Sequence, residues 1–172
     1  MKVRYRLAGR NKEIVSDYFR KMGMHIGRNC NICDNITTTQ GYLINIGDNV
    51  TISGGVTFVG HDNCISKMIP GKTDLFGRIT IGDNCFIGNR ALILYGVSLA
   101  NDIVVAAGSV VTHSFDTQRI IIGGNPARII GTWDDFIDKN KLRAFNLNEI
   151  SPQDEQNIIE KSSMLVMRPT KK

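Results

Sequence analysis

The sequence predicts an all-β fold, a parallel β-helix in which each coil of the chain has three short faces. Aliphatic residues recur at six-residue steps in the second half of the 172-residue chain, the residue after each is mostly very small, and the residue four places after it is mostly compact. The aliphatic residues are Ile81, Ile87, Ile93, Leu99, Val105 and Val111. Six residues make one short strand and one corner, so three repeats form a triangular coil of about 18 residues with its aliphatic side chains inside.

The same register occurs earlier in the chain, at Ile26, Ile32, Ile46, Ile52 and Phe58. A helix would space its apolar residues by about 3.6, and a half-buried strand would alternate and then turn, so neither explains a period of six. Gly-Asp-Asn, at residues 47–49 and again at 82–84, supplies corner residues that tolerate a positive φ. An ordinary β-sandwich with coincidental spacing is the alternative.

Two interruptions break the repeat, one at residues 37–45 and one between Phe58 and Ile81. The second gap is 23 residues long where 18 would keep the register. This difference predicts that about five residues bulge outward, in a loop that covers about residues 62–80. Loops held by a regular scaffold are frequent sites of function.

Helices are expected on both sides of the coiled domain, which we place at residues 26–131. Residues 1–25 are expected to form a helical cap, with one apolar stripe made of Ile14, Val15, Tyr18, Phe19 and Met22. Residues 132–172 are expected to form a C-terminal helical extension. Its first helix starts at Thr132-Trp-Asp-Asp135, and its buried stripe is expected to be Trp133, Phe136 and Ile137. Ser151-Pro152 starts a second helix. A β-helix needs its open ends covered, and these helices are the expected lids.

Composition narrows the class of protein and its compartment. The chain is 42% hydrophobic and 22% charged, which is ordinary for a soluble domain. No run of about 18 apolar residues occurs, and the N-terminus lacks the apolar core of a secretory signal, so no integral membrane association is expected. The four cysteines then indicate free thiols in a reducing cytoplasm. The net charge of +5 gathers near the two ends of the chain as solvated surface, and no nucleic-acid partner is expected.

The chain has three histidines, His25, His61 and His113. His61 opens the outward loop, and a histidine at the root of a loop that interrupts a regular scaffold is well placed for acid–base chemistry. The alternative is a solvated turn residue. Asp62 is a candidate to orient the imidazole, although neighbouring residues in an extended strand usually point to opposite faces.

Residues 79–130 resemble the C-terminal coils of the galactoside, maltose, streptogramin and capsular-sugar acetyltransferases, a family of hexapeptide-repeat acyltransferases. The resemblance rests on Ile81-Gly-Asp-Asn-Cys-Phe-Ile-Gly88, Ala107-Gly-Ser-Val-Val-Thr112 and Gly124-Asn-Pro-Ala-Arg128. It implies left-handed coils, an exception to the usual right-handed crossover, together with a homotrimer and acetyl-CoA as the acyl donor. The loop sequence Thr57-Phe-Val-Gly-His-Asp62 resembles members that decorate surface polysaccharides. The implied reaction is acetyl transfer to a hydroxyl of a sugar or a polysaccharide precursor.

In that family a histidine at this place is the general base, which assigns the role to His61. An alcohol attacks a thioester poorly until its proton is removed, and imidazole, with an unperturbed pKa of about 6.5, suits that transfer at neutral pH. Carried over by motif, the expected CoA contacts are Asn89, Ala107, Thr112 and Arg128. Arg128 is the candidate partner of a CoA phosphate.

Some positions depart from the family pattern. Phe86 stands where relatives often have Trp, and His113 stands where they often have Lys, so these two contacts to CoA are less well supported. The residues that bind galactoside in its acetyltransferase align approximately with Cys33 and Gly41, which argues against a galactoside specialist.

Four other interpretations use the same features differently. A γ-type carbonic anhydrase has this fold and binds zinc through three histidines, but two of those lie close together in sequence, and His25, His61 and His113 are widely spaced. A purely structural β-helix would have fewer interruptions. Cys30-Asn-Ile-Cys33 has the spacing of a zinc or redox pair, but Cys30 occupies a small-residue position of the repeat, where a thiol simply packs. We therefore expect no metal. Cys64 is a candidate nucleophile for an acyl-enzyme route.

Overall fold

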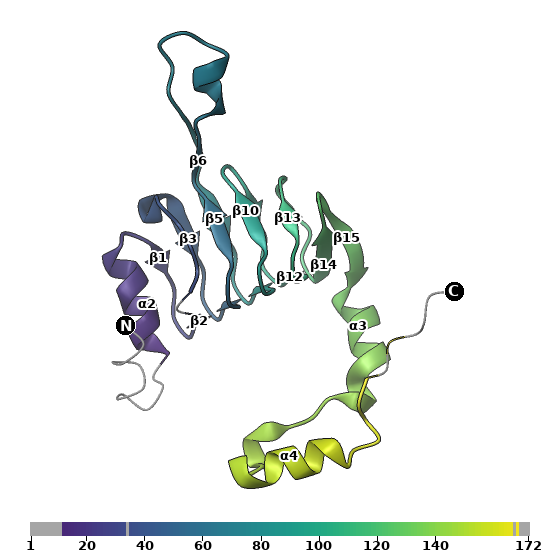
Figure 1. Ribbon diagram of the computed structural model, residues 1–172. Coiled ribbons are helices and arrows are strands. Elements are labelled where there is room, and N and C mark those ends of the chain that lie inside the picture. Colours follow the sequence, from purple (N-terminus) through teal and green to yellow (C-terminus); the bar gives the residue numbers. More distant parts are fainter. Residues whose placement is uncertain (1–11, 34, 167, 169–172) are drawn as a thin grey trace. The chain divides into compact units, whose positions relative to one another are not determined.

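The chain forms a parallel β-helix with three faces, seen in a computed structural model that describes residues 12–33, 35–166 and 168 (Figure 1). Face A consists of β1 (His25–Ile26), β3 (Ile44–Ile46), β8 (Ile79–Ile81) and β11 (Ser98–Leu99). Face B consists of β2 (Asn31–Ile32), β4 (Thr51–Ile52), β9 (Phe86–Ile87), β12 (Ile103–Val105) and β14 (Ile120–Gly124). Face C consists of β5 (Thr57–Val59), β10 (Leu92–Leu94) and β13 (Val110–Val111). The strands that neighbour each other within these faces are parallel.

The core is the predicted ladder of aliphatic side chains. Ile81, Ile87, Ile93, Leu99, Val105 and Val111 are each at most 1% exposed. The compact residues four places later, such as Cys85 and Ala91, are buried among them. Equivalent residues of successive coils pair in register, for example Ile52 with Ile87. This ladder confirms the six-residue reading, and the β-sandwich alternative is wrong.

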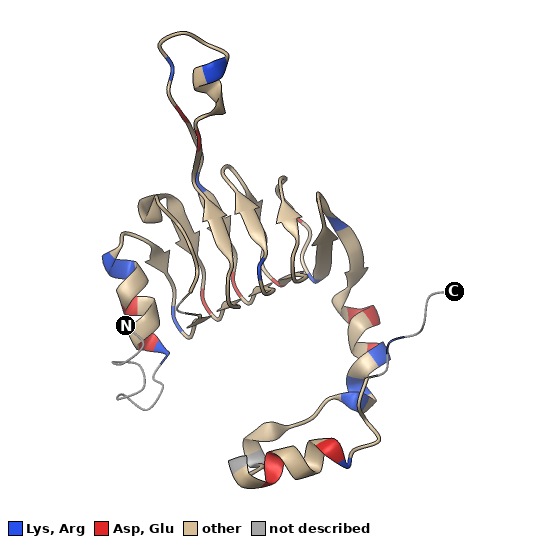
Figure 2. Ribbon diagram, viewed as in Figure 1, with Lys and Arg blue, Asp and Glu red and all other residues tan. Residues whose placement is uncertain are grey.

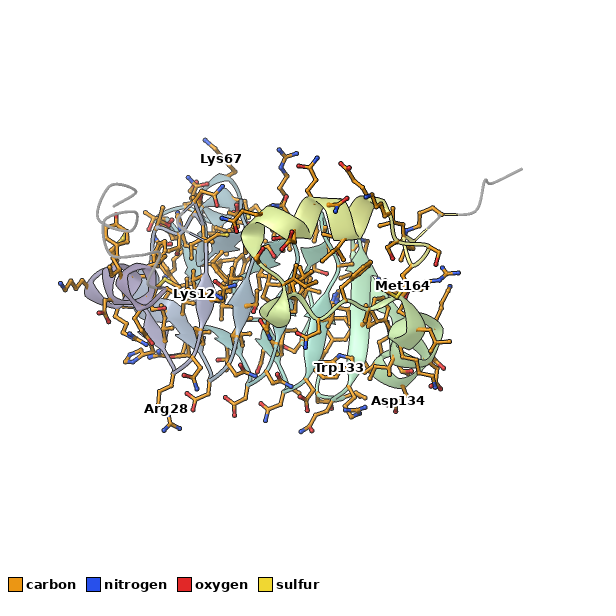
Figure 3. The ribbon with its side chains drawn as sticks, turned by 90° about the horizontal axis from the view of Figure 1, so that it is seen from below. Lys12, Arg28, Lys67, Trp133, Asp134 and Met164 are labelled. Atoms are coloured by element: carbon orange, nitrogen blue, oxygen red, sulfur yellow. The ribbon has the colours of Figure 1, made fainter. Side chains whose placement is uncertain are left out.

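The corner between faces A and B is held by a ladder of polar side chains. Asp48 Oδ1 accepts a hydrogen bond of 2.8 Å from the backbone N–H of Arg28, and the N–H of Asp48 donates to Asp83 Oδ1, also at 2.8 Å. Arg28 projects from this corner, with Nη2 2.7 Å from Asp48 Oδ2 (Figure 3). Asn49 and Asn84 adopt φ of +58° and +54°, as predicted for the Gly-Asp-Asn corners. The ladder satisfies corner amides that have no partner in a strand.

Both predicted interruptions leave the prism at the corner between faces C and A. The first contains the short 3-10 helix η1 (Gly41–Leu43). The second contains β6 (His61–Asp62), the 3-10 helix η2 (Cys64–Lys67) and β7 (Leu75–Phe76), and it projects away from the coils as a hairpin loop (Figure 1). We call residues 60–77 the hairpin loop.

The hairpin loop is larger than the sequence spacing indicated. Phe58 lies on face C and Ile81 lies on face A directly after it, so a single six-residue step separates them in the repeat. Since Ile81 follows Phe58 by 23 residues, 17 residues are inserted rather than about five. The prediction of about five inserted residues was wrong because it counted a whole 18-residue coil within the gap.

Helix α2 (Glu13–Lys21) contacts β1 and β2 of the first coil. Val15 and Phe19 are buried, as expected for the apolar stripe. Tyr18 and Met22 are exposed, so the stripe is narrower than predicted. Arg20 ties the helix to the coil, because its guanidinium donates to the carbonyl oxygens of Ile26 and Gly27 at 3.0 and 2.7 Å. Residues 1–11 of the predicted cap lie outside the described residues.

At the other end of the coils, β15 (Ala127–Thr132) turns back and pairs antiparallel with β14. A second compact unit begins at Trp133 and contains α3 (Trp133–Asn140), η3 (Lys141–Arg143), η4 (Leu147–Glu149) and α4 (Pro152–Glu160). Both expected helices are present, and Ser151 caps α4 by accepting from the N–H of Asp154. The prediction that α3 has a buried stripe is wrong, since Phe136 and Ile137 are 56% and 48% exposed. A helix of eight residues in so small a unit has little surface to pack against.

No helix among the described residues is long and apolar enough to cross a membrane.

Candidate active site

His61 lies at the neck of the hairpin loop, where the chain leaves face C. It pairs with Phe76 across the two strands of the loop, and the two rings stack with centroids 5.8 Å apart and an interplanar angle of 27°. Below them the N–H of Gly77 donates to the carbonyl oxygen of Gly60 at 3.3 Å. The His61 side chain is 35% exposed. The imidazole is therefore fixed by both strands of the neck and still reachable from solvent.

The Nδ1 atom of His61 is held from the neighbouring coil. Gln40 Oε1 lies 2.8 Å from it, and Thr39 Oγ1 lies 3.5 Å away, at the limit of a hydrogen bond. Gln40 belongs to the first interruption, which reaches this corner because Thr37 bridges to Thr57 one coil further along. A side chain at Gly60 would place its Cβ 3.1 Å from Gln40 Cβ and Oε1. The glycine therefore leaves room for the amide that contacts the imidazole.

The Nε2 atom of His61 faces a carboxylate from the other side of the loop, at the residue directly before β7. Asp74 Oδ1 lies 3.9 Å from Nε2, which is beyond hydrogen-bonding distance. The Asp74 side chain is 27% exposed. Acidic positions mark both strands of the neck (Figure 2). A ligand hydroxyl could lie against both groups at this point.

Asp62, the acid next to His61 in sequence, does not orient the imidazole. Its Oδ1 accepts a hydrogen bond of 2.8 Å from the N–H of Cys64, and this bond lowers the pKa of the Asp62 carboxyl. As the alternation of an extended strand indicates, Asp62 lies on the other side of the chain from the ring. The orienting contact comes instead from Gln40, far away in sequence.

Three cysteines, Cys30, Cys64 and Cys85, have thiol pKa values above the ordinary value and so are not activated as nucleophiles. The hydrogen bond to the Asp62 carboxylate raises the pKa of the exposed Cys64 thiol, so little thiolate is present at neutral pH. Burial raises the pKa of Cys85 to about 11, and its Sγ donates to the carbonyl oxygen of Ala100 at 3.2 Å. Cys30 is buried in the same way, as expected for a packing residue.

The expected CoA contacts lie on two edges of the prism. Asn89 and Ala107 occupy equivalent corners between faces B and C on successive coils, and the N–H of Gly108 donates to the carbonyl oxygen of Asn89 at 2.8 Å. Arg128 continues this edge from β15, opposite Gly123 of β14. It is exposed, and its Nη1 donates to the carbonyl oxygen of Ala127 at 2.9 Å.

Thr112 stands apart from these three residues, at the end of face C and on the same edge of the prism as His61. Its Oγ1 lies 2.7 Å from His113 Nδ1. Phe86 is 43% exposed on face B. Within one chain, face C therefore separates Thr112 from the edge that carries Asn89, Ala107 and Arg128.

The three histidines are not gathered at one place. His25 lies on face A in the first coil, while His113 contacts Thr112 at a later corner. Across the described part of the chain, no three His, Cys, Asp or Glu side chains are grouped as ligands of a metal ion. Within one chain the three histidines therefore do not converge.

Three residues around His61 were not predicted from the sequence: Gln40, Asp74 and Phe76. A signal for Gln40 existed, because the repeat register places residue 37 beside residue 57 and so brings the first interruption next to the start of the second. Asp74 and Phe76 carried no comparable signal, since their position depends on how the hairpin loop folds back.

Comparisons with known proteins agree with the coiled fold. A family model described as the hexapeptide repeat of succinyl-transferase matches residues 78–113. The chain is 43% identical to Protein CapG of Staphylococcus aureus over 125 residues, which are 69% of this chain and 72% of that protein. It is 33% identical to Galactoside O-acetyltransferase of Escherichia coli (strain K12) over 108 residues, 62% of this chain and 53% of that protein.

Two solved structures extend the comparison. A maltose O-acetyltransferase from Clostridium difficile 630 is 26% identical, with a TM-score of 0.57 over 68% of this chain and 73% of its own. A hexapeptide-repeat acetyltransferase from Vibrio cholerae O1 biovar eltor, solved with acetyl coenzyme A, is 29% identical, with a TM-score of 0.59 over 64% of this chain and 61% of its own.

Proposed function

The chain belongs to the hexapeptide-repeat acetyltransferases, which fold as left-handed β-helices, and we propose that it transfers an acetyl group from acetyl-CoA to a hydroxyl of a sugar or surface-polysaccharide precursor. His61 is the proposed general base. The observation that carries this role is the pair of contacts on its ring, with Gln40 Oε1 2.8 Å from Nδ1 and Nε2 left open toward Asp74.

The proposed reaction is one direct transfer. Nε2 of His61 takes the proton of the acceptor hydroxyl while the hydroxyl oxygen bonds to the carbonyl carbon of the thioester. The carbon–sulfur bond then breaks, the acetyl group stays on the acceptor, and the imidazolium returns its proton to the CoA thiolate. The Asp74 carboxylate stands on the Nε2 side, where it would stabilise the imidazolium formed between these steps.

The surroundings of Nε2 favour an acceptor with several hydroxyls. An unprotonated Nε2 and the Asp74 carboxylate both accept hydrogen bonds, and they face each other across 3.9 Å. Two neighbouring hydroxyls of one sugar ring can donate to both, whereas an isolated alcohol can donate to one. The names of the galactoside and maltose O-acetyltransferase relatives support the same class of acceptor.

CoA is proposed to bind between subunits of a homotrimer. The proposed contacts Asn89, Ala107 and Arg128 lie on one edge, and Thr112 lies with His61 on another. A cleft between two copies would bring the two kinds of edge together. Face C also turns aliphatic side chains outward, with Leu92 and Leu94 only partly buried in the single chain, and such a surface favours association.

We propose a cytoplasmic location as well. The four cysteines, all among the described residues, form no disulfide, and two of them are exposed. Exposed thiols persist in a reducing compartment.

Replacement of His61 by Ala tests the proposal. Turnover with acetyl-CoA and a sugar acceptor found by mass-shift screening should fall by roughly 10²–10⁴-fold, because a placed base contributes about that much. CoA affinity and the circular dichroism spectrum should stay unchanged, since a half-exposed loop side chain adds little to the core.

The wild type should gain activity as pH rises and the imidazolium loses its proton, and the variant should lose that dependence. His25→Ala and His113→Ala are the matched controls and should keep most of their turnover. Cys64→Ser separates the two mechanisms. A dead Cys64 variant beside a His61 variant that keeps more than about a tenth of its rate would replace direct transfer by an acyl-enzyme route.

A further inference from the structure

We propose that Gln40 is a positioning residue that holds His61 in the tautomer with the proton on Nδ1, so that Nε2 carries the lone pair. This inference rests on the proposed role of His61 as the base. It concerns which ring nitrogen of His61 is free to accept a proton. Neither the repeat pattern nor the name of any relative bears on that choice.

Hydrogen-bond geometry supports this tautomer. A neutral imidazole has one N–H donor and one acceptor nitrogen, and the partner of one nitrogen decides the state of the other. Gln40 presents its carbonyl oxygen to Nδ1 at 2.8 Å, and an oxygen can only accept there. Nδ1 must then carry the proton. The lone pair is left on Nε2, on the side of Asp74.

The Thr39 hydroxyl is a second partner of the Gln40 amide oxygen. The Thr39 hydroxyl donates to Gln40 Oε1, the same oxygen that accepts from Nδ1. One carbonyl oxygen has two lone pairs and can accept both bonds. With the amide reversed, the NH₂ group would face Nδ1, and the proton would have to move to Nε2. Nε2 would then be unable to accept a proton from a substrate.

The backbone around the contact is shaped for Gln40. The bridge from Thr37 to Thr57 stacks the two interruptions on adjacent coils. Gly60 lacks the Cβ that would come within 3.1 Å of the Gln40 amide oxygen. Gln40 is itself half-buried at this corner. A glutamine, unlike an aspartate or glutamate, orients the ring without adding a second negative charge to that of Asp74, and a second charge would further favour the protonated and therefore inactive base.

Nitrogen-15 NMR of the full chain labelled at histidine reads the tautomer directly. The two ring nitrogens have distinct shifts when protonated and unprotonated, and a spectrum of His61→Ala assigns the His61 signals among the three histidines. Measured at a pH where the rings are neutral, the wild type should show protonated Nδ1 and unprotonated Nε2.

Gln40→Met has similar length and no acceptor, and its His61 signals should move toward protonated Nε2. Gln40→Glu keeps an oxygen and should retain the wild-type tautomer. Gln118→Met removes an exposed glutamine elsewhere and should change nothing. Turnover of Gln40→Met should fall by about 10- to 100-fold, the usual loss when an orienting partner is removed, with the KM for acetyl-CoA unchanged.

Each outcome is decisive. Protonated Nε2 in the wild type, or a Gln40→Met protein that keeps protonated Nδ1, would overturn the inference while leaving the role of His61 to its own test. A fully active His61→Ala protein would overturn the proposed function, and the spectra would still report whether Gln40 sets the tautomer. Unchanged signals of His25 and His113 in the Gln40 variants show that the fold is intact.

Discussion

Replacing Arg128 by Ala should weaken CoA binding selectively. The side chain is exposed on the edge that carries Asn89 and Ala107, and its Nη1 donates a hydrogen bond of 2.9 Å to the carbonyl oxygen of its neighbour Ala127. Most of the guanidinium is therefore available to a phosphate. One charge-assisted bond contributes about 1.5 to 3 kcal/mol, or about 10- to 150-fold in affinity. Because Arg128 is exposed and the charges are screened, we expect the lower end, about tenfold.

Isothermal titration calorimetry with CoA and with 3′-dephospho-CoA measures this effect. If Arg128 binds the 3′-phosphate, Arg128→Ala should lose about tenfold with CoA and almost nothing with dephospho-CoA. Arg28→Ala is the matched control, because it removes one exposed arginine of the same charge from a different edge. Equal losses for both cofactors would refute the assignment to that phosphate. Losses shared by both arginine variants would show a general effect of net charge.

Three further predictions follow from the structure. A thiol reagent at neutral pH should label the exposed Cys64 in the folded protein, more slowly than an unperturbed thiol because its pKa is raised, and should label Cys85 only after unfolding. Cys85 is buried, and its pKa of about 11 keeps the thiol protonated well above neutral pH. Gly82→Ala should lower the free energy of unfolding by about 1–3 kcal/mol in chemical denaturation, since its Cβ would lie 2.7 Å from the backbone nitrogen of Asn101. Gly131→Ala meets nothing within 4 Å and should change that free energy by less than about 1 kcal/mol. Light scattering should report a trimer, and a monomer of 19.1 kDa at micromolar concentration would contradict the proposed cleft between subunits.

The fold was predictable because few folds are compatible with a six-residue period of aliphatic side chains. Each repeat must turn one aliphatic residue inward, so a residue such as Ile87 could be placed in the core from spacing alone, and it is fully buried. The corner asparagines were predictable for a similar reason, since few residues adopt a positive φ. Tyr18, Met22 and Phe136 were placed wrongly because a helical stripe shows which side chains could be buried, whereas burial depends on the surface that is present to receive them.

Of the three side chains His61, Gln40 and Asp74, only His61 was predicted from the sequence. His61 stood out because it begins the loop that breaks the repeat. Gln40 did not stand out by residue type, and the signal for it was indirect, because the register of the repeat was needed to place the first interruption beside the second. Asp74 depends on still more, since both strands of the hairpin loop must pair before its carboxylate lies 3.9 Å from Nε2.

The two interruptions of the repeat explain why the candidate catalytic side chains lie together at this corner. A regular coil places its polar groups in ladders that satisfy one another, as Asp48 and Asp83 do at the corner between faces A and B. Groups bonded in that way have little capacity left for a substrate. At the corner between faces C and A, the interruptions replace such a ladder with side chains on irregular backbone. Gln40 comes from the first, and the second supplies His61 from β6 and Asp74 from the position directly before β7. Since the interruptions leave from adjacent coils, the rigid prism sets the distance between them, and an orienting amide can be held against a base without a dedicated core. The interruptions are therefore what converts a structural repeat into a candidate catalytic one.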